Sequence, residues 1–160
     1  MRLEPSLRLR LEFLCRVVQK ESQYLQETSA RLSIQPLTPE ALKRISDDSL
    51  LAERLDAFVG RFGRLQDTLT DKFLPALLDA MAEPKASAIE NLDRAEKLSW
   101  IHSTDEWLEI RKLRNQMVHE YIEDLFVLSN ALMAGQRFVS KLSVATESFV
   151  AQAKKRIEDS

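Results

Sequence analysis

Apolar residues recur at intervals of three and four along most of the chain, which is the spacing of one face of an α-helix. The first such run predicts an amphipathic helix over residues 4–33. Its stripe consists of Leu3, Leu7, Leu11, Leu14, Val18 and Leu25, widened by Leu9, Phe13, Val17 and Tyr24. The alternation at 7–11 also suits a strand, but it is short and the sequence offers no second strand to pair with it.

Capping residues mark where the next helices begin. Thr38 followed by Pro39 predicts a short helix to Ile45, because a threonine oxygen can accept hydrogen bonds from the first N–H groups and proline fits the first turn. Residues 46–48 offer a second cap before a long apolar stripe over 50–73.

Glycine and proline interrupt that second long helix. Gly60 and Gly63 lie within it, and each costs up to about 1 kcal/mol relative to alanine, so a close helix crossing or a subunit contact is expected to compensate. Pro75 is expected to kink or restart the helix, whose apolar face continues to Met81.

Two Ser-x-x-Glu patterns predict two further helices, because each is the capping-box arrangement. Ser87 with Glu90 opens a helix through Leu98, and Ser103 with Glu106 opens the next.

A last long helix is predicted beyond Tyr121, which Gly135 could bend. Three glycines and five prolines in 160 residues leave little turn chemistry for a sheet. We therefore expect an all-α fold in a single domain spanning residues 1–160.

Charge and cysteine content limit the function classes. The formal net charge is −2, so any contact with RNA has to be local. The single cysteine, Cys15, cannot form an internal disulfide, and neither a membrane-spanning run nor a signal-peptide core is present, so a cytoplasmic protein is expected. One cysteine and two histidines exclude a zinc cluster, and no Gly-rich phosphate loop occurs, so neither a metal nor a cofactor is expected.

The richest chemistry lies in residues 107–126. An apolar arc of this predicted helix holds Trp107, Ile110, Leu113, Met117, Val118 and Tyr121. Arg114 falls within the arc, and a buried guanidinium needs a carboxylate, backbone carbonyls or a phosphate as its partner. Asp67 on the second long helix is the candidate carboxylate, although an exposed Asp67 paired with Arg64 is the simpler interpretation.

Asn115 and His119 are four residues apart and share a neighbouring face. Arg114 and His119 diverge by roughly 140° on an ideal helix. They can serve one site if the helix ends or bends near His119, if Arg114 reaches sideways, or if a second subunit completes the pocket.

The run 114–119, Arg-Asn-Gln-Met-Val-His, matches the Arg-Asn-x-x-x-His signature of HEPN domains, and Tyr121 extends it to the Arg-x4-His-x-Tyr form of HepT-like toxins. The run 61–67, Arg-Phe-Gly-Arg-Leu-Gln-Asp, also resembles members of this group. The resemblance implies an up-and-down helical bundle of the HEPN type. It also implies a metal-independent ribonuclease toxin that forms a homodimer with a composite cleft and pairs with a nucleotidyltransferase antitoxin of the MNT type.

Such cleavage needs groups that move protons and a positive charge on the phosphate. Histidine suits proton transfer because its unperturbed pKa is about 6.5, and the planar fork of arginine suits phosphate. We therefore hypothesise that His119 is the general acid or base, that Arg114 stabilises the scissile phosphate, and that Asn115 orients one of them. The resemblance implies products with a 2′,3′-cyclic phosphate and a 5′-hydroxyl.

Tyr121 resembles the position at which the MNT-type antitoxin attaches AMP in HepT-like toxins. An AMP there would block RNA, and the hypothesis requires an accessible Tyr121 oxygen. Other interpretations stay open: Arg114 paired with a carboxylate, His119 satisfied at a helix end, and Tyr121 in the core. The alternative functions are a noncatalytic HEPN-like module, which binds a nucleotide or scaffolds a nucleotidyltransferase, and a purely structural bundle.

Overall fold

The computed structural model describes residues 2–84, 86–119 and 124–160, and within these ranges the chain forms helices and no strand. The all-α fold class is therefore confirmed. The elements in chain order are α1 (Pro5–Leu32), α2 (Pro39–Leu42), the 3₁₀-helix η1 (Lys43–Ser46), α3 (Ser49–Asp67), the π-helix η2 (Thr68–Phe73), α4 (Leu74–Ala80), α5 (Ala88–Lys97), α6 (Thr104–His119) and α7 (Leu125–Glu158).

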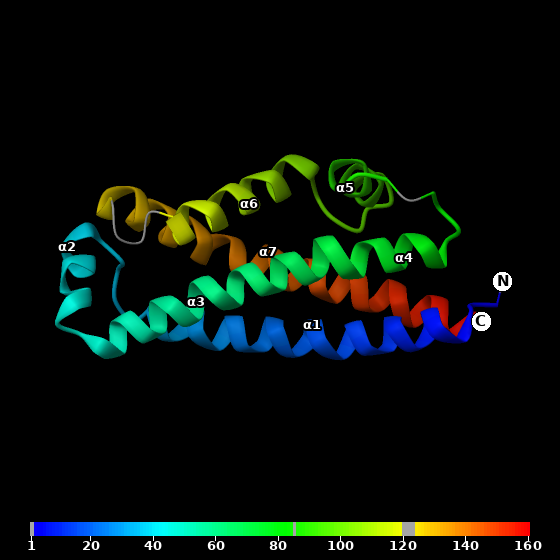
Figure 1. The fold of residues 1–160 in the computed structure, drawn as a ribbon, viewed down its shortest axis with the longest axis horizontal. Helices are drawn as coiled ribbons and strands as arrows, with labels where there is room; N and C mark the ends of the chain where they lie inside the picture. Colours follow the sequence, from blue (N-terminus) through cyan, green and yellow to red (C-terminus); the bar gives the residue numbers. More distant parts are fainter. Residues whose placement is uncertain (1, 85, 120–123) are drawn as a thin grey trace.

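The long helices run along the long axis of the molecule, and successive ones run in opposite directions (Figure 1). α1 packs against both α3 and α7, and α6 packs against α7 and α3. α3, η2 and α4 follow one another as a single rod, while α5 lies across the bundle near one end and α2 lies at the other (Figure 1). The C-terminus of α6 and the N-terminus of α7 therefore meet near α2.

The predicted caps form because each depends only on neighbours within one helical turn. A side-chain oxygen accepts a hydrogen bond from the backbone N–H three residues later in each case. The pairs are Thr38 with Ala41 at 3.2 Å, Asp48 with Leu51 at 3.0 Å, Ser87 with Glu90 at 3.2 Å and Ser103 with Glu106 at 3.1 Å.

The restart predicted at Pro75 takes the form of a wide turn. The N–H of Leu74 donates to the carbonyl of Leu69, five residues earlier, at the end of the π-helix η2. A proline ring clashes with the carbonyl four residues before it in a regular α-helix, and the wider π turn relieves that contact. α4 then begins at Leu74 without breaking the rod.

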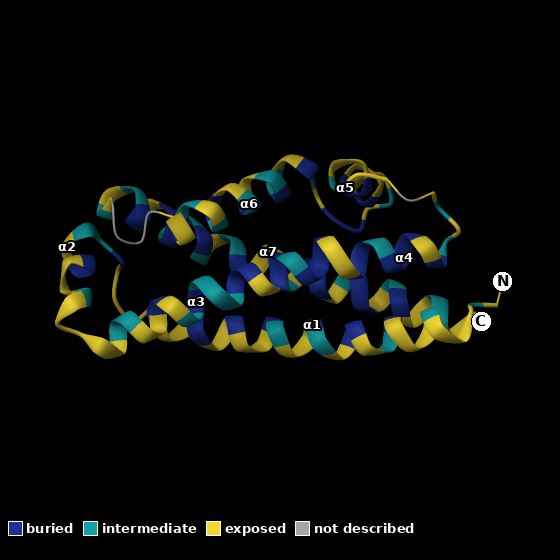
Figure 2. Cartoon of the chain, in the orientation of Figure 1, coloured by how far each residue is buried: buried dark blue, intermediate teal, exposed yellow. Residues whose placement is uncertain are grey.

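The core lies between the long helices, whose buried positions face inward (Figure 2). Phe58 and Phe62 of α3 are fully buried with ring centroids 5.8 Å apart. Gly135 of α7 lies against Phe58, since a Cβ there would lie 3.4 Å from both the Phe58 ring and the Met117 sulfur. α7 continues through Gly135 as one α-helix.

The apolar stripe predicted for α1 is wider than the surface that its neighbours cover. Leu9, Phe13 and Tyr24 are 66%, 53% and 43% exposed, so their expected place in the buried stripe is wrong. Cys15 is buried in the core. None of the described helices combines the length and the apolarity that crossing a membrane requires.

Candidate functional site

Arg114 lies where α6 crosses α3. Its Nη2 donates a hydrogen bond to Oδ2 of Asp67 at 3.0 Å, so the ion pair considered from the sequence is formed. On the way it passes over Gly63, where an added Cβ would lie only 3.0 Å from the Arg114 Nε. The glycine therefore makes room for the arginine, which is the close helix crossing expected at this position.

The Arg114–Asp67 pair is partly open to solvent, with exposed side-chain fractions of 34% and 40%. A pair of this exposure contributes at most about 1 kcal/mol to stability. A guanidinium carries five N–H donors, and among the described residues Arg114 uses one of them in a side-chain hydrogen bond. The remaining donors leave the group able to bind a phosphate oxygen at the same time.

Asn115 and His119 line a shallow groove on the outer face of α6, with a volume of about 430 Å³. The described residues that form it are Leu108, Arg111, Lys112, Asn115, Gln116 and His119. Arg114 is absent from this set because its side chain turns toward α3. The fold thus brings Asn115 and His119 together and leaves Arg114 on an adjacent face, as the helical spacing implies.

Two cations in the groove were not among the sequence candidates. Arg111 and Lys112 lie one helical turn before Asn115 and Gln116, respectively, and give the groove a local positive charge. Asp71 of η2 approaches Arg111 at 3.9 Å and offsets part of it. The sequence did contain a signal for these cations, because Arg111 and Asn115 are four residues apart and therefore share a helix face. The net charge of −2 for the whole chain gives no indication of this local positive charge.

His119 is the last described residue of α6 and is exposed. A histidine in the last turn also suits the negative end of the helix, which is the structural interpretation of this residue. Val118 is 51% exposed, so its predicted place on the buried arc is wrong. The neighbouring helices cover only the part of the arc that holds Trp107, Ile110, Leu113 and Met117. Tyr121, the predicted modification site, lies outside the described residues.

Comparison of the chain with family models, with curated proteins and with solved structures finds no match. The resemblance to HepT-like toxins therefore depends on the runs 61–67 and 114–121 and on how the fold arranges their described residues. Within the described ranges, no three His, Cys, Asp or Glu side chains gather where they could hold a metal ion.

Gly60 and Gly63 provide a matched pair for testing the crossing. Gly60→Ala is expected to raise the free energy of unfolding by up to about 1 kcal/mol, because the new Cβ meets only the Arg64 guanidinium at 3.8 Å. Gly63→Ala is expected not to raise the free energy of unfolding, because Arg114 must move to relieve a contact of 3.0 Å with the new Cβ. Urea denaturation of both variants measures the difference, and equal stabilisation would show that the crossing is looser than described.

Glu21 of α1 lies beside this crossing and is half-buried. Its carboxylate accepts a hydrogen bond from the Thr68 hydroxyl, with both oxygens at 3.1 Å. Burial raises the pKa of Glu21, the Thr68 hydrogen bond and the nearby Arg64 oppose that rise, and Asp67 adds to it. The folded state therefore holds this proton more tightly than the unfolded state does, and stability falls as the pH rises through the pKa of Glu21 in the folded protein.

Glu21→Gln is expected to be more stable than the parent chain at pH 7, because the amide stays neutral and keeps an oxygen for the Thr68 hydroxyl. The gain should stay below about 1 kcal/mol because the site is partly solvated. It should vanish below the usual pKa of 4.5, where Glu21 is protonated in both states. Urea denaturation at pH 4 and pH 7 tests this, with the exposed Glu27→Gln as control; equal effects of the two substitutions at pH 7 would contradict it.

Proposed function

We propose that the chain is a metal-independent endoribonuclease of the HEPN type, acting in the cytoplasm as the toxin of a toxin–antitoxin pair. One observation carries the proposal. The two runs that resemble HepT-like toxins, 61–67 and 114–121, meet in space, because Gly63 and Asp67 of α3 contact Arg114 of α6. Asp67 and Arg114 are 47 positions apart, so this meeting is a property of the fold. The HEPN type of the bundle is part of the same proposal.

The proposed reaction is attack of the 2′-oxygen of RNA on the adjacent phosphorus. The bond from phosphorus to the 5′-oxygen breaks, giving a 2′,3′-cyclic phosphate and a 5′-hydroxyl. One proton leaves the 2′-hydroxyl and one reaches the 5′-oxygen, and His119 serves as general base or acid. Arg114 stabilises the charge on the phosphate, and Asn115 orients the histidine or the phosphate.

The groove supports this assignment electrostatically. Arg111 and Lys112 stand next to Asn115 and His119, where they can attract the phosphodiester backbone. The local positive charge supplies what a chain of net charge −2 lacks as a whole.

A homodimer completes the proposed site, since Arg114 and His119 point to adjacent faces of α6. Val118 and Phe126 support the dimer, because these apolar side chains are 51% and 70% exposed on either side of the junction between α6 and α7. Exposed apolar side chains of this kind are common in subunit interfaces. Two copies meeting there would place two His119 side chains at a shared cleft.

A noncatalytic role is the second candidate, favoured by the internal ion pair of Arg114. Because Arg114 is held by Asp67 and does not line the groove of His119, the same surface could bind a nucleotide or scaffold a nucleotidyltransferase without cleaving RNA.

The proposed regulator is a nucleotidyltransferase antitoxin of the MNT type that attaches AMP to Tyr121. Tyr121 follows His119 by two residues, so an AMP there would bring a negative charge close to the proposed catalytic group. Incubation with such a partner and ATP should raise the intact mass of the chain by whole AMP units, and an unchanged mass would count against modification.

The decisive experiment is cleavage of RNA by the purified chain in EDTA. We expect cleavage to persist in the chelator and to leave 2′,3′-cyclic phosphate and 5′-hydroxyl ends, which end-specific labelling of the fragments detects. Intact RNA, together with retained binding of the nucleotidyltransferase, would instead establish the noncatalytic role.

A further inference from the structure

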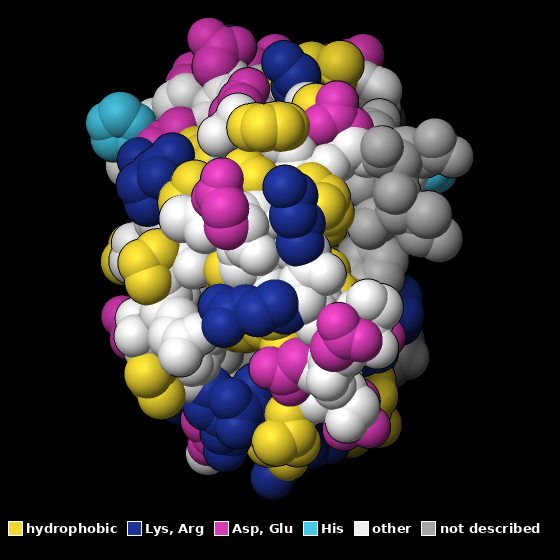
Figure 3. Space-filling model, turned by 90° about the vertical axis from the view of Figure 1, so that its left-hand side faces the viewer, with side chains coloured by type: hydrophobic (Ala, Val, Ile, Leu, Met, Phe, Trp, Pro, Cys, Tyr) yellow, Lys and Arg dark blue, Asp and Glu magenta, His cyan; other side chains and the backbone are white. Residues whose placement is uncertain are grey.

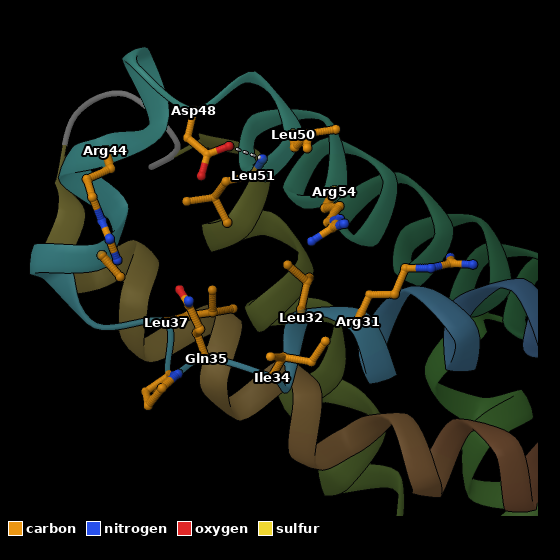
Figure 4. Close-up of a pocket in the computed structure, with 12 residues that line it drawn as sticks. Arg31, Leu32, Ile34, Gln35, Leu37, Arg44, Asp48, Leu50, Leu51 and Arg54 are labelled. Carbon is orange, nitrogen blue, oxygen red and sulfur yellow. Dashed lines mark hydrogen bonds between the residues drawn. The ribbon is translucent and has the colours of Figure 1, made fainter.

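A second pocket lies at the end of the bundle that carries α2, away from α5. It is enclosed by the end of α1, the linker 33–38, η1 and the first turns of α3 (Figure 4). Its volume is about 180 Å³, below the usual range for whole ligands, so it suits one chemical group with the rest of the ligand at the mouth. None of the described residues lines both this pocket and the groove of His119.

Three arginines and one carboxylate line the pocket: Arg31, Arg44, Arg54 and Asp48. Figure 4 shows Arg44 and Arg54 on opposite sides of the space, while the guanidinium of Arg31 extends outward from the rim. Among the described residues, no carboxylate forms an ion pair with any of these arginines. Where they face the space, Arg44 and Arg54 therefore exceed Asp48 by one positive charge.

Asp48 does not neutralise the arginines by direct pairing. Its Oδ1 accepts the N–H of Leu51 at 3.0 Å and caps α3, which holds the carboxylate at the helix terminus (Figure 4). Figure 3, which looks onto this end of the molecule, shows Lys and Arg side chains down the face, with hydrophobic side chains and Asp and Glu side chains among them.

The rest of the lining is mostly apolar. Leu32 and Leu37 are buried, while Leu50 and Ile34, which also line the pocket, are 62% and 78% exposed. Gln35 is the uncharged polar side chain among the described lining residues. A ligand that fits must therefore combine an anion with a flat or apolar part.

We propose that this pocket binds the phosphate monoester of a nucleotide, with the phosphate between Arg44 and Arg54 and the base against Leu50 and Ile34. A phosphate monoester ends its molecule and carries about −1.5 to −2 charges at neutral pH, so it can enter a space that suits one chemical group. A phosphodiester is joined to a sugar on both sides and cannot enter in this way. Guanidinium groups bind phosphate oxygens in pairs and also stack on flat rings. A sugar phosphate fits less well, because its hydroxyls would lose water against apolar side chains.

The nucleotide could be a free mononucleotide or the 5′-phosphorylated end of an RNA, which present the same chemistry. Titration calorimetry of the full chain with AMP, ribose 5-phosphate, adenosine and inorganic phosphate tests the shared chemistry. We expect AMP to bind most tightly. Arg44→Gln and Arg54→Gln should each weaken AMP binding by about 10- to 100-fold, as loss of a charge-assisted hydrogen bond does.

Arg10→Gln is the matched control, because Arg10 is an exposed arginine of α1 outside the pocket. It should leave AMP affinity unchanged, and circular dichroism should show the same helix content for all variants. No binding of AMP at millimolar concentration, equal binding of AMP and adenosine, or equal affinity in the Arg44 and Arg54 variants would overturn the proposal.

Competition by oligoribonucleotides identifies the source. If a 5′-phosphorylated oligonucleotide displaces AMP and its 5′-hydroxyl counterpart does not, the pocket takes RNA ends; if neither does, it takes free mononucleotides. His119→Ala should retain AMP binding, so a failure of the ribonuclease proposal and a failure of this one are read separately.

Discussion

RNA cleavage by the His119→Ala variant is expected to fall by about 10²- to 10⁴-fold, the usual contribution of general acid–base catalysis. His119 lines the groove together with Asn115 and two cations, and it is the proton-transfer group assigned there. The loss should appear in the rate of the chemical step under saturating RNA, because the cations that attract the backbone are unchanged. Fragment analysis over time in EDTA measures the rate.

The second histidine of the chain provides the matched control. His102 is 88% exposed, pairs with Glu106 at 3.4 Å and lines a different pocket. His102→Ala should therefore cleave RNA at the parental rate. Neither substitution should change the fold, since both side chains are exposed. Parental activity in His119→Ala would remove the proposed general acid or base and with it the proposed mechanism.

Phe58→Ala is expected to lower the free energy of unfolding by about 3–5 kcal/mol, which is a large part of the roughly 5–15 kcal/mol that stabilises a domain. Phe58 is fully buried, packs on Phe62 and lies against Gly135 of α7. Alanine at position 58 would leave a cavity beside Gly135, which has no side chain to fill it. Urea denaturation at constant pH measures the loss.

Phe13→Ala is the control for that substitution. Phe13 is 53% exposed on α1, so its removal should cost less than about 1 kcal/mol. Similar losses in the two variants would mean that Phe58 is not at the centre of the core.

The helices and four of their N-terminal caps could be predicted from the sequence, because a cap depends on neighbours along the chain. The Asp124 cap at the start of α7 was missed. Thr38, Asp48, Ser87 and Ser103 each cap a helix through a backbone N–H three residues away. The apolar periodicity likewise predicted the all-α fold. Residues spaced by three and four lie on one face in a helix but not in a strand. Of the candidate site, the sequence predicted that Asn115 and His119 share a face.

The tertiary structure decided which surfaces are covered. Leu9 and Val118 belong to apolar stripes in the sequence, yet they are 66% and 51% exposed, because the neighbouring helices cover only part of each stripe. The periodicity predicts which face of a helix is apolar. It does not predict how much of that face the neighbouring helices will cover.

Contacts between distant segments were also beyond the sequence pattern. From the sequence, Asp67 could pair either with Arg114 or with Arg64. The crossing of α3 and α6 at Gly63 brings its carboxylate to Arg114. The arginine pocket joins residues of α1, η1 and α3 that no local pattern connects. By itself the sequence determined the helices and one face of the proposed site. The packing of those helices determined the rest, because contact between residues tens of positions apart depends on the positions of whole helices.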